Sequence, residues 1–170
     1  MKFIHLTMLF FLITSPALYA QDLSSVYTPL TNCKLIESSA EGTGSSVEEC
    51  PGQEDYRLFI EGGDTRTWLV LKKGKQSKVS LWDEVMHNAP GLFAEVSGKV
   101  AEWRYRGKVP IALIFRISGT EEIFTDDHSL PMYKEKSILL VIRLQNNQIC
   151  LIGKTTSNVE ARKMADSQKT

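Results

Sequence analysis

Short runs of β-forming residues follow one another along most of this 170-residue chain, and the segments between them are brief. Few of those segments could hold the helix that joins two parallel strands, so neighbouring strands should pair antiparallel. We predict a mostly β fold in a single domain. In it, one antiparallel sheet curls toward a barrel or a sandwich, and a short helix follows at the C-terminus.

Two runs, residues 109–115 and 138–144, are apolar at successive positions. Because successive strand residues face opposite sides of a sheet, these runs should be central strands buried on both faces. The segment between them, residues 118–131, is polar and is predicted to be a connection. Asp83 can cap a single helical turn, which Pro90 would end.

Residues 100–106 alternate between apolar and charged side chains. The alternation places Trp103 on the core face of a strand, while Glu102, Arg104 and Arg106 share the other face. The favoured interpretation is a solvent-exposed polar face above a core tryptophan. The alternative is a binding patch, in which the guanidinium groups bind a carboxylate or a phosphate.

The first twenty residues have the order of a secretory signal peptide: a basic start at Lys2, an apolar stretch, and small residues up to Ala20. The apolar stretch is shorter than the about 20 residues that a spanning helix needs. We therefore expect residues 1–20 to be a signal peptide. Residues 21–170 would form one exported domain, periplasmic or secreted, without a transmembrane anchor.

The three cysteines, Cys33, Cys50 and Cys150, all follow the predicted signal peptide. They allow three single pairings, between which the sequence does not decide. A Cys33–Cys50 disulfide is favoured, because it would close a polar excursion around residues 40–46 in a compartment where disulfides persist. Cys150 lies in an apolar run and is interpreted as a buried thiol, with an intermolecular disulfide as the alternative.

The charge balance argues against nucleic-acid binding, and the sequence contains only a weak candidate for a metal site. Basic and acidic residues number 20 each, and removing Lys2 leaves 19 against 20. A chain with this charge balance has no excess of positive charge with which to attract nucleic acid. Asp126, Asp127 and His128 are the best candidates for a metal site, although a solvated loop is favoured, since adjacent strand residues point apart. We expect no cofactor.

Six short motifs follow one another: Val26-Tyr27-Thr28, Cys33-Lys34, Cys50-Pro51-Gly52, Glu102-Trp103-Arg104, Pro110-Ile111-Ala112 and residues 161–166. In this order they resemble a family of small exported bacterial proteins of unknown function. The resemblance implies an exported location and a fold, but no activity and no catalytic residues. Members of that family have a further cysteine near the C-terminus that could pair with the one at Cys150, and this sequence has none there.

Three hypotheses for the function follow. The first is a non-enzymatic exported β-domain that binds a protein or another partner in the cell envelope or outside it, because no catalytic constellation is present. The second is a small-molecule carrier whose apolar pocket is lined by residues 111–115 and 138–144. The third, less favoured, is a metal-dependent hydrolase that uses Asp126, Asp127 and His128.

Overall fold

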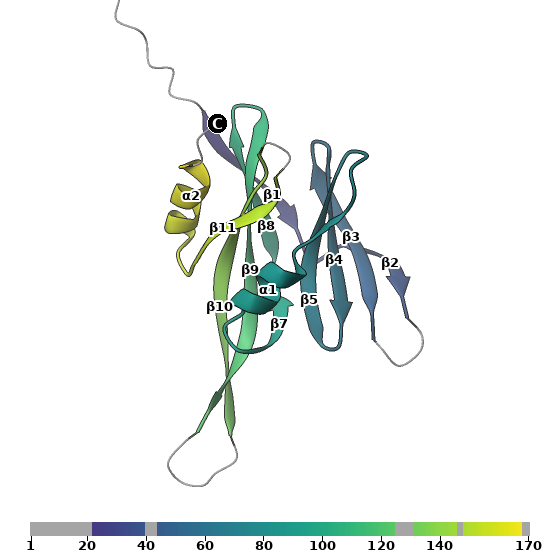
Figure 1. Cartoon of the computed structure of the whole chain (residues 1–170), viewed down its shortest axis with the longest axis vertical. Coiled ribbons are helices and arrows are strands. Elements are labelled where there is room, and N and C mark those ends of the chain that lie inside the picture. Colours follow the sequence, from purple (N-terminus) through teal and green to yellow (C-terminus); the bar gives the residue numbers. More distant parts are fainter. Residues whose placement is uncertain (1–21, 40–43, 125–130, 146–147, 168–170) are drawn as a thin grey trace, which may run out of the picture.

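The computed structural model describes residues 22–39, 44–124, 131–145 and 148–167. Over these residues the strands form two antiparallel sheets, which face each other and are accompanied by two short helices (Figure 1). Sheet A contains β1 (Leu23–Pro29), β7 (Leu92–Val96), β8 (Val100–Arg106), β9 (Val109–Ile123), β10 (Met132–Arg143) and β11 (Cys150–Thr155). Sheet B contains β2 (Lys34–Ser38), β3 (Ser46–Gln53), β4 (Tyr56–Gly63), β5 (Arg66–Lys73) and β6 (Val79–Ser80). The helices are α1 (Trp82–Asn88) and α2 (Asn158–Asp166).

The predicted mostly β, antiparallel fold with a short C-terminal helix is confirmed. Sheet A has the order β1-β8-β9-β10-β11, with β7 also paired to β9, and sheet B has the order β2-β3-β4-β5-β6. The strands thus divide between two sheets that do not close into a barrel, and the sandwich is the alternative that describes the molecule.

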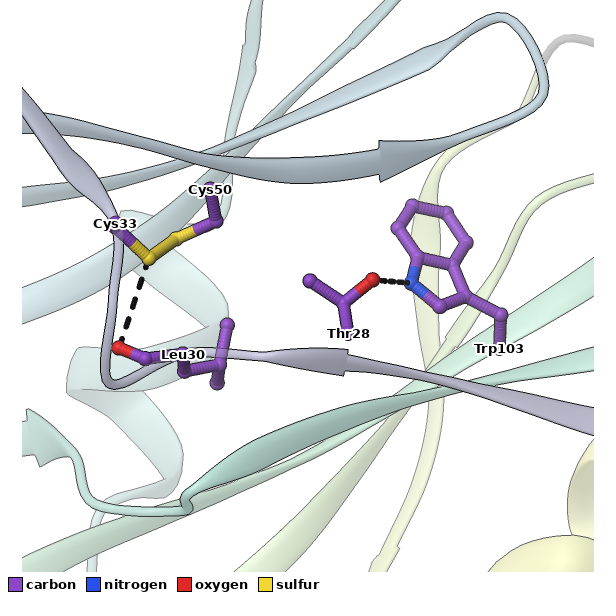
Figure 2. The surroundings of a disulfide bond; sticks show 5 residues. All are labelled: Thr28, Leu30, Cys33, Cys50 and Trp103. Carbon is purple, nitrogen blue, oxygen red and sulfur yellow. Dashed lines mark hydrogen bonds between the residues drawn. A yellow bond between two sulfur atoms is a disulfide. The ribbon is translucent and has the colours of Figure 1, made fainter.

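The main core lies between the two sheets. Its fully buried side chains come from both of them and include Leu58, Leu69 and Leu71 of sheet B and Trp103, Leu113, Ile117, Leu140 and Ile142 of sheet A. Trp103 lies on the core face, as its alternation with charged neighbours predicts. Its indole Nε1 donates a hydrogen bond of 2.9 Å to Thr28 Oγ1, so the buried polar end of the ring is satisfied (Figure 2).

The predicted disulfide between Cys33 and Cys50 is present (Figure 2). It lies where the chain leaves β1 of sheet A and enters β2 of sheet B, and it joins this crossing to β3. The Cys33 sulfur is 3.6 Å from the Leu30 carbonyl oxygen, a contact without a proton because the sulfur is in a disulfide. The segment between the cysteines is an antiparallel hairpin of β2 and β3 where it is described, rather than only a polar excursion. Cys150, at the start of β11, is a free, half-buried thiol.

Helix α2 covers the face of sheet A that points away from sheet B (Figure 1). Ala161 and Ala165 of the helix are fully buried, and they pack with Ala112, Ile114, Leu139 and Val141 of β9 and β10. Sheet A is therefore covered on both faces. This explains why residues 109–115 and 138–144 are apolar at successive positions, and their prediction as strands buried on both faces is confirmed.

Two local predictions are wrong. Residues 118–123 belong to β9 and pair with residues 132–137 of β10, so this part of the predicted polar connection is a hairpin. Beyond the buried Ser118 and Gly119, these residues are exposed or half-buried, and their polar composition resembles that of a loop. Helix α1 begins at Trp82 and exceeds one turn, and its N-cap is Leu81 rather than Asp83. Trp82, the first residue of this helix, is 39% exposed and packs edge-on against Trp68.

Candidate functional site

The charged face of β8 lies beneath α2, where it takes part in a group of polar contacts that we call the α2 network. Its members are Ser25, Tyr27, Glu102, Arg104, Arg106, Arg162 and Asp166. Three of the residues predicted as a binding patch belong to it. The fourth, Trp103, points into the core on the opposite face of the strand.

Glu102 is the buried acid of the α2 network, with 7% of its side chain exposed. Arg162 Nε donates to Glu102 Oε1 at 2.7 Å, and Ser25 Oγ donates to the same carboxylate oxygen. The hydrogen bonds to Glu102 raise the pKa of the Arg162 guanidinium above its usual value. Arg162 Nη2 also donates to Tyr27 Oη at 3.0 Å, so the helix is tied to both β8 and β1.

Arg104 is the buried base of the network, with 9% of its side chain exposed. Its Nη2 donates to both carboxylate oxygens of Asp166, at 2.8 and 2.6 Å, and its Nε donates at 3.0 Å to the first of them. Its Nη1 donates to Ser25 Oγ at 2.7 Å. Arg106 Nη2 donates to the backbone carbonyl of Asp166 at 2.8 Å. Both predicted arginines are therefore bound to the end of α2.

The spacing of these charges explains why the helix docks here. Two residues along a strand advance about 6.6 Å, and four residues along a helix advance about 6 Å. Glu102 and Arg104 are two apart on β8, while Arg162 and Asp166 are four apart on α2. Each strand charge thus meets an opposite helix charge: Glu102 pairs with Arg162, and Arg104 pairs with Asp166. The network holds α2 in place.

The predicted metal candidates lie elsewhere. Asp126, Asp127 and His128 fall outside the described residues. Within the described ranges, no group of three or more His, Cys, Asp and Glu side chains is placed to hold a metal ion.

A second candidate region is the projecting end of the β9–β10 hairpin, which we call the arm: residues 118–124 and 132–137. Figure 1 shows these strands running past the end of the sandwich as a two-stranded ribbon. Large apolar side chains on the arm and on the neighbouring β7 are 49–74% exposed: Leu92, Phe93, Phe124, Met132 and Tyr133. A gathering of exposed apolar side chains marks interaction sites more often than ordinary surface.

A hollow of about 320 Å³ lies at the base of the arm, and we call it the arm-base hollow. It is lined by Thr65, Phe93, Glu95, Ser118, Gly119, Thr120, Tyr133 and Glu135. The lining thus contains two aromatic rings and two carboxylates, and no basic side chain. Glu95 Oε1 accepts a hydrogen bond of 2.9 Å from Ser118 Oγ, which orients that carboxylate along the wall.

The backbone of β7 is specially shaped to form this hollow. Gly91 has φ +119°, and a Cβ at this position would collide with the carbonyl of Thr120 on β9. Two residues later the pairing register shifts, and Phe93 adopts φ +54°, a left-handed conformation that costs free energy for a bulky residue. The strained residue holds its ring on the surface, with the Arg66 guanidinium 6.0 Å from the ring centroid.

Sequence reasoning missed the arm-base hollow, because residues 118–131 were interpreted as one polar connection. A usable signal was present. Thr120, Ile123 and Tyr133 are β-forming residues placed on both sides of the stretch that lies outside the described residues, as in a continuing hairpin.

Comparisons of the chain with protein-family models, with curated proteins and with solved structures give no match, so the function is argued from the site alone. The helices of the described residues are all too short or too polar to cross a membrane.

Proposed function

We propose that this protein is a non-enzymatic, exported β-domain that binds a partner protein at the arm-base hollow. The observation that carries the proposal is the pair of exposed aromatic side chains, Phe93 and Tyr133, which line one hollow beside a strained backbone. Export is supported by the signal-peptide pattern of residues 1–20 and by the Cys33–Cys50 disulfide, which suits an oxidising compartment. The partner is then an envelope or extracellular protein. The resemblance to small exported bacterial proteins agrees with this location.

The chemistry of the hollow favours a basic side chain of the partner. Phe93 and Tyr133 can present ring faces to a lysine or arginine, and Glu95 and Glu135 can accept its hydrogen bonds. The position of Arg66 near Phe93 is an example, within this chain, of a cation on that ring.

The carrier hypothesis has less support. The apolar runs that would line its pocket instead fill two packed cores, in which Leu113, Leu140 and Val141 are fully buried. The arm-base hollow, by contrast, already presents side chains of the type used in recognition.

Site-specific photocrosslinking tests the proposal. A benzophenone amino acid would replace Tyr133 in the arm, or Val159 of α2, which is 60% exposed and serves as the matched control. Crosslinking would be performed with an envelope extract of the producing cells. We expect one defined protein to be captured from position 133 and not from position 159, with capture lost in the Glu135→Lys variant and weakened by salt. Equal capture from both positions, or capture that survives Glu135→Lys, would overturn the proposal.

A further inference from the structure

A second hollow, of about 280 Å³, lies beside the start of α2, on the face of sheet A that this helix covers (Figure 1). We call it the helix-side hollow. Its lining comes from β1, β8, β9 and β10, from the loop between β7 and β8, and from α2. A water molecule occupies about 30 Å³ in the liquid, so the hollow has room for about nine of them, or for one small organic molecule.

The floor of the helix-side hollow is apolar. Ile114 of β9 and Leu139 of β10 line it, and both are buried in the small core beneath α2. Val100 and Tyr27 also line the hollow, and their side chains are exposed. The Tyr27 hydroxyl accepts a hydrogen bond of 3.0 Å from Arg162, which holds the ring in place. The hollow therefore offers a fixed apolar surface, open to solvent, on which an apolar group can pack.

The charges of the lining leave an excess of positive charge. Three bases and one acid line the hollow: Lys99, Arg116, Arg162 and Glu102. Glu102 is already paired with Arg162, and it accepts a further hydrogen bond from Ser25. Lys99 and Arg116 form no ion pair with another described residue. Two cations therefore remain available to bind an anion.

Arg116 is oriented for this task. Its Nη1 donates a hydrogen bond of 3.1 Å to Ser137 Oγ, while its Nε and Nη2 have no partner among the described residues. Two neighbouring nitrogens of a guanidinium can bind a carboxylate bidentately. The loop that contains Lys99 lies beside Arg116, because the Ser97 backbone N–H donates to the Arg116 carbonyl at 3.1 Å. Gly98 permits this approach, since a Cβ there would lie 3.1 Å from the Arg116 Cβ.

We propose that the helix-side hollow binds a carboxylate that carries a small apolar body. The carboxylate would lie at Arg116 and Lys99, and the apolar body would cover Ile114, Leu139 and Val100. A short fatty acid and the C-terminal residue of a peptide share this chemistry. No residue lines both this hollow and the arm-base hollow, so the inference stands or falls independently of the partner-binding proposal.

Nuclear magnetic resonance titration of the isotope-labelled protein tests the inference. The probes are N-acetyl-leucine and hexanoate. The controls are N-acetyl-leucinamide, which lacks the charge, and acetate, which lacks the apolar body. We expect saturable shifts in the backbone amides of residues 98–100, 114–116 and 139 with at least one probe, and binding weaker by about tenfold or more for both controls.

The two probes separate the sources of the ligand. Tighter binding of N-acetyl-leucine would support a peptide C-terminus, and tighter binding of hexanoate would support a fatty acid. If neither probe binds saturably at millimolar concentration, or if either control binds as tightly as the probes, the inference is overturned. Saturable shifts confined to other residues would overturn the placement.

Variants with matched controls locate the binding in the hollow. Lys99→Gln and Val100→Ser change exposed side chains of the lining and should weaken the better probe about threefold. Lys75→Gln and Val109→Ser change exposed side chains outside it and should leave the affinity unchanged. Arg116→Gln should weaken the probe about tenfold and retain the thermal transition. Unchanged affinity in both Lys99→Gln and Arg116→Gln, or equal losses in the control variants, would overturn the placement.

Discussion

The outer face of sheet A differs between the part that α2 covers and the part that forms the arm. Beneath the helix, the buried charges Glu102 and Arg104 each have a partner of opposite sign from the same chain. Glu135 of the arm stands on the same face of β10 as Leu139, since the two are four residues apart. There, carboxylates and aromatic rings line a hollow that the chain itself leaves open.

The difference follows from spacing rather than from composition. Glu102 and Arg104 meet their partners because the helix repeats charge at nearly the same distance as the strand. The arm has no such element above it among the described residues. We infer that polar groups satisfied within the chain stabilise the fold, while those left open at the arm base are available to a partner. The two roles differ in their effect on the free energy of unfolding.

The largest effect is expected for Asp166→Ala. The substitution leaves the Arg104 guanidinium buried without its carboxylate, and breaking a buried pair costs about 3–5 kcal/mol. Because Asp166 is 23% exposed, we expect the lower end, about 3 kcal/mol, in the free energy of unfolding measured with urea. The control, Glu121→Ala, breaks an exposed pair with Lys136 and should cost less than about 1 kcal/mol.

A double variant sharpens this prediction. Arg104→Leu with Asp166→Leu removes both charges, and well-packed apolar replacements of a buried pair are often neutral. It should therefore recover most of the stability lost in Asp166→Ala. If Asp166→Ala and Glu121→Ala have the same small effect, the α2 network does not stabilise the fold as argued.

The next effect concerns the backbone at the arm base. Gly91→Ala would place a Cβ against the Thr120 carbonyl at φ +119°, and strain of this kind costs about 1–3 kcal/mol. We expect about 2 kcal/mol in urea unfolding, with shifted backbone amide resonances in β7 and the arm. The control Gly107→Ala, at φ +60° with open space around it, should cost only about 1 kcal/mol. Equal costs would show that the approach of β7 to β9 is not constrained at this residue.

The strands around Leu113 and Val141 were predictable, because a helix on one face and a sheet on the other require apolar residues at successive positions. The contact of α2 with sheet A was harder to predict. Ala161 and Ala165 give the helix little apolar area, but their small side chains let it approach the sheet closely. The complementary spacing of Arg162 and Asp166 could have shown this.

The arm was not predictable from residue type. Beyond the buried Ser118 and Gly119, its strands have no buried apolar face that distinguishes them from a loop, and only the pairing between residues 118–123 and 132–137 defines them. The division into two sheets was missed for a related reason. Consecutive strands β1 and β2 belong to different sheets, and nothing in their sequences states which partner each one takes. Such pairings depend on the whole fold.

A smaller effect is expected at the start of α2. Ser157 Oγ accepts a hydrogen bond of 3.4 Å from the Glu160 backbone amide, and the Glu160 carboxylate accepts one from Thr155 Oγ1. Loss of an N-cap costs about 1 kcal/mol, so Ser157→Ala should lower stability by that amount in urea unfolding. Ser167→Ala, at the other end of the helix, should cost less than about 0.5 kcal/mol. A cost for Ser157→Ala no larger than that of Ser167→Ala would contradict the capping role.

The smallest effect on stability is expected at the arm-base hollow, and it tests the comparison most directly. Tyr133 is 61% exposed, and Glu135 is exposed and forms no ion pair with another described residue. Exposed substitutions of this kind change stability by at most about 0.5 kcal/mol, so Tyr133→Ser with Glu135→Gln should unfold like the unmodified protein. A loss above about 1 kcal/mol would mean that these side chains stabilise the fold, as the α2 network does. Unchanged stability together with loss of the crosslinked partner would instead separate the two regions by role. The polar groups beneath α2 would then stabilise the fold, and those at the arm-base hollow would bind a partner.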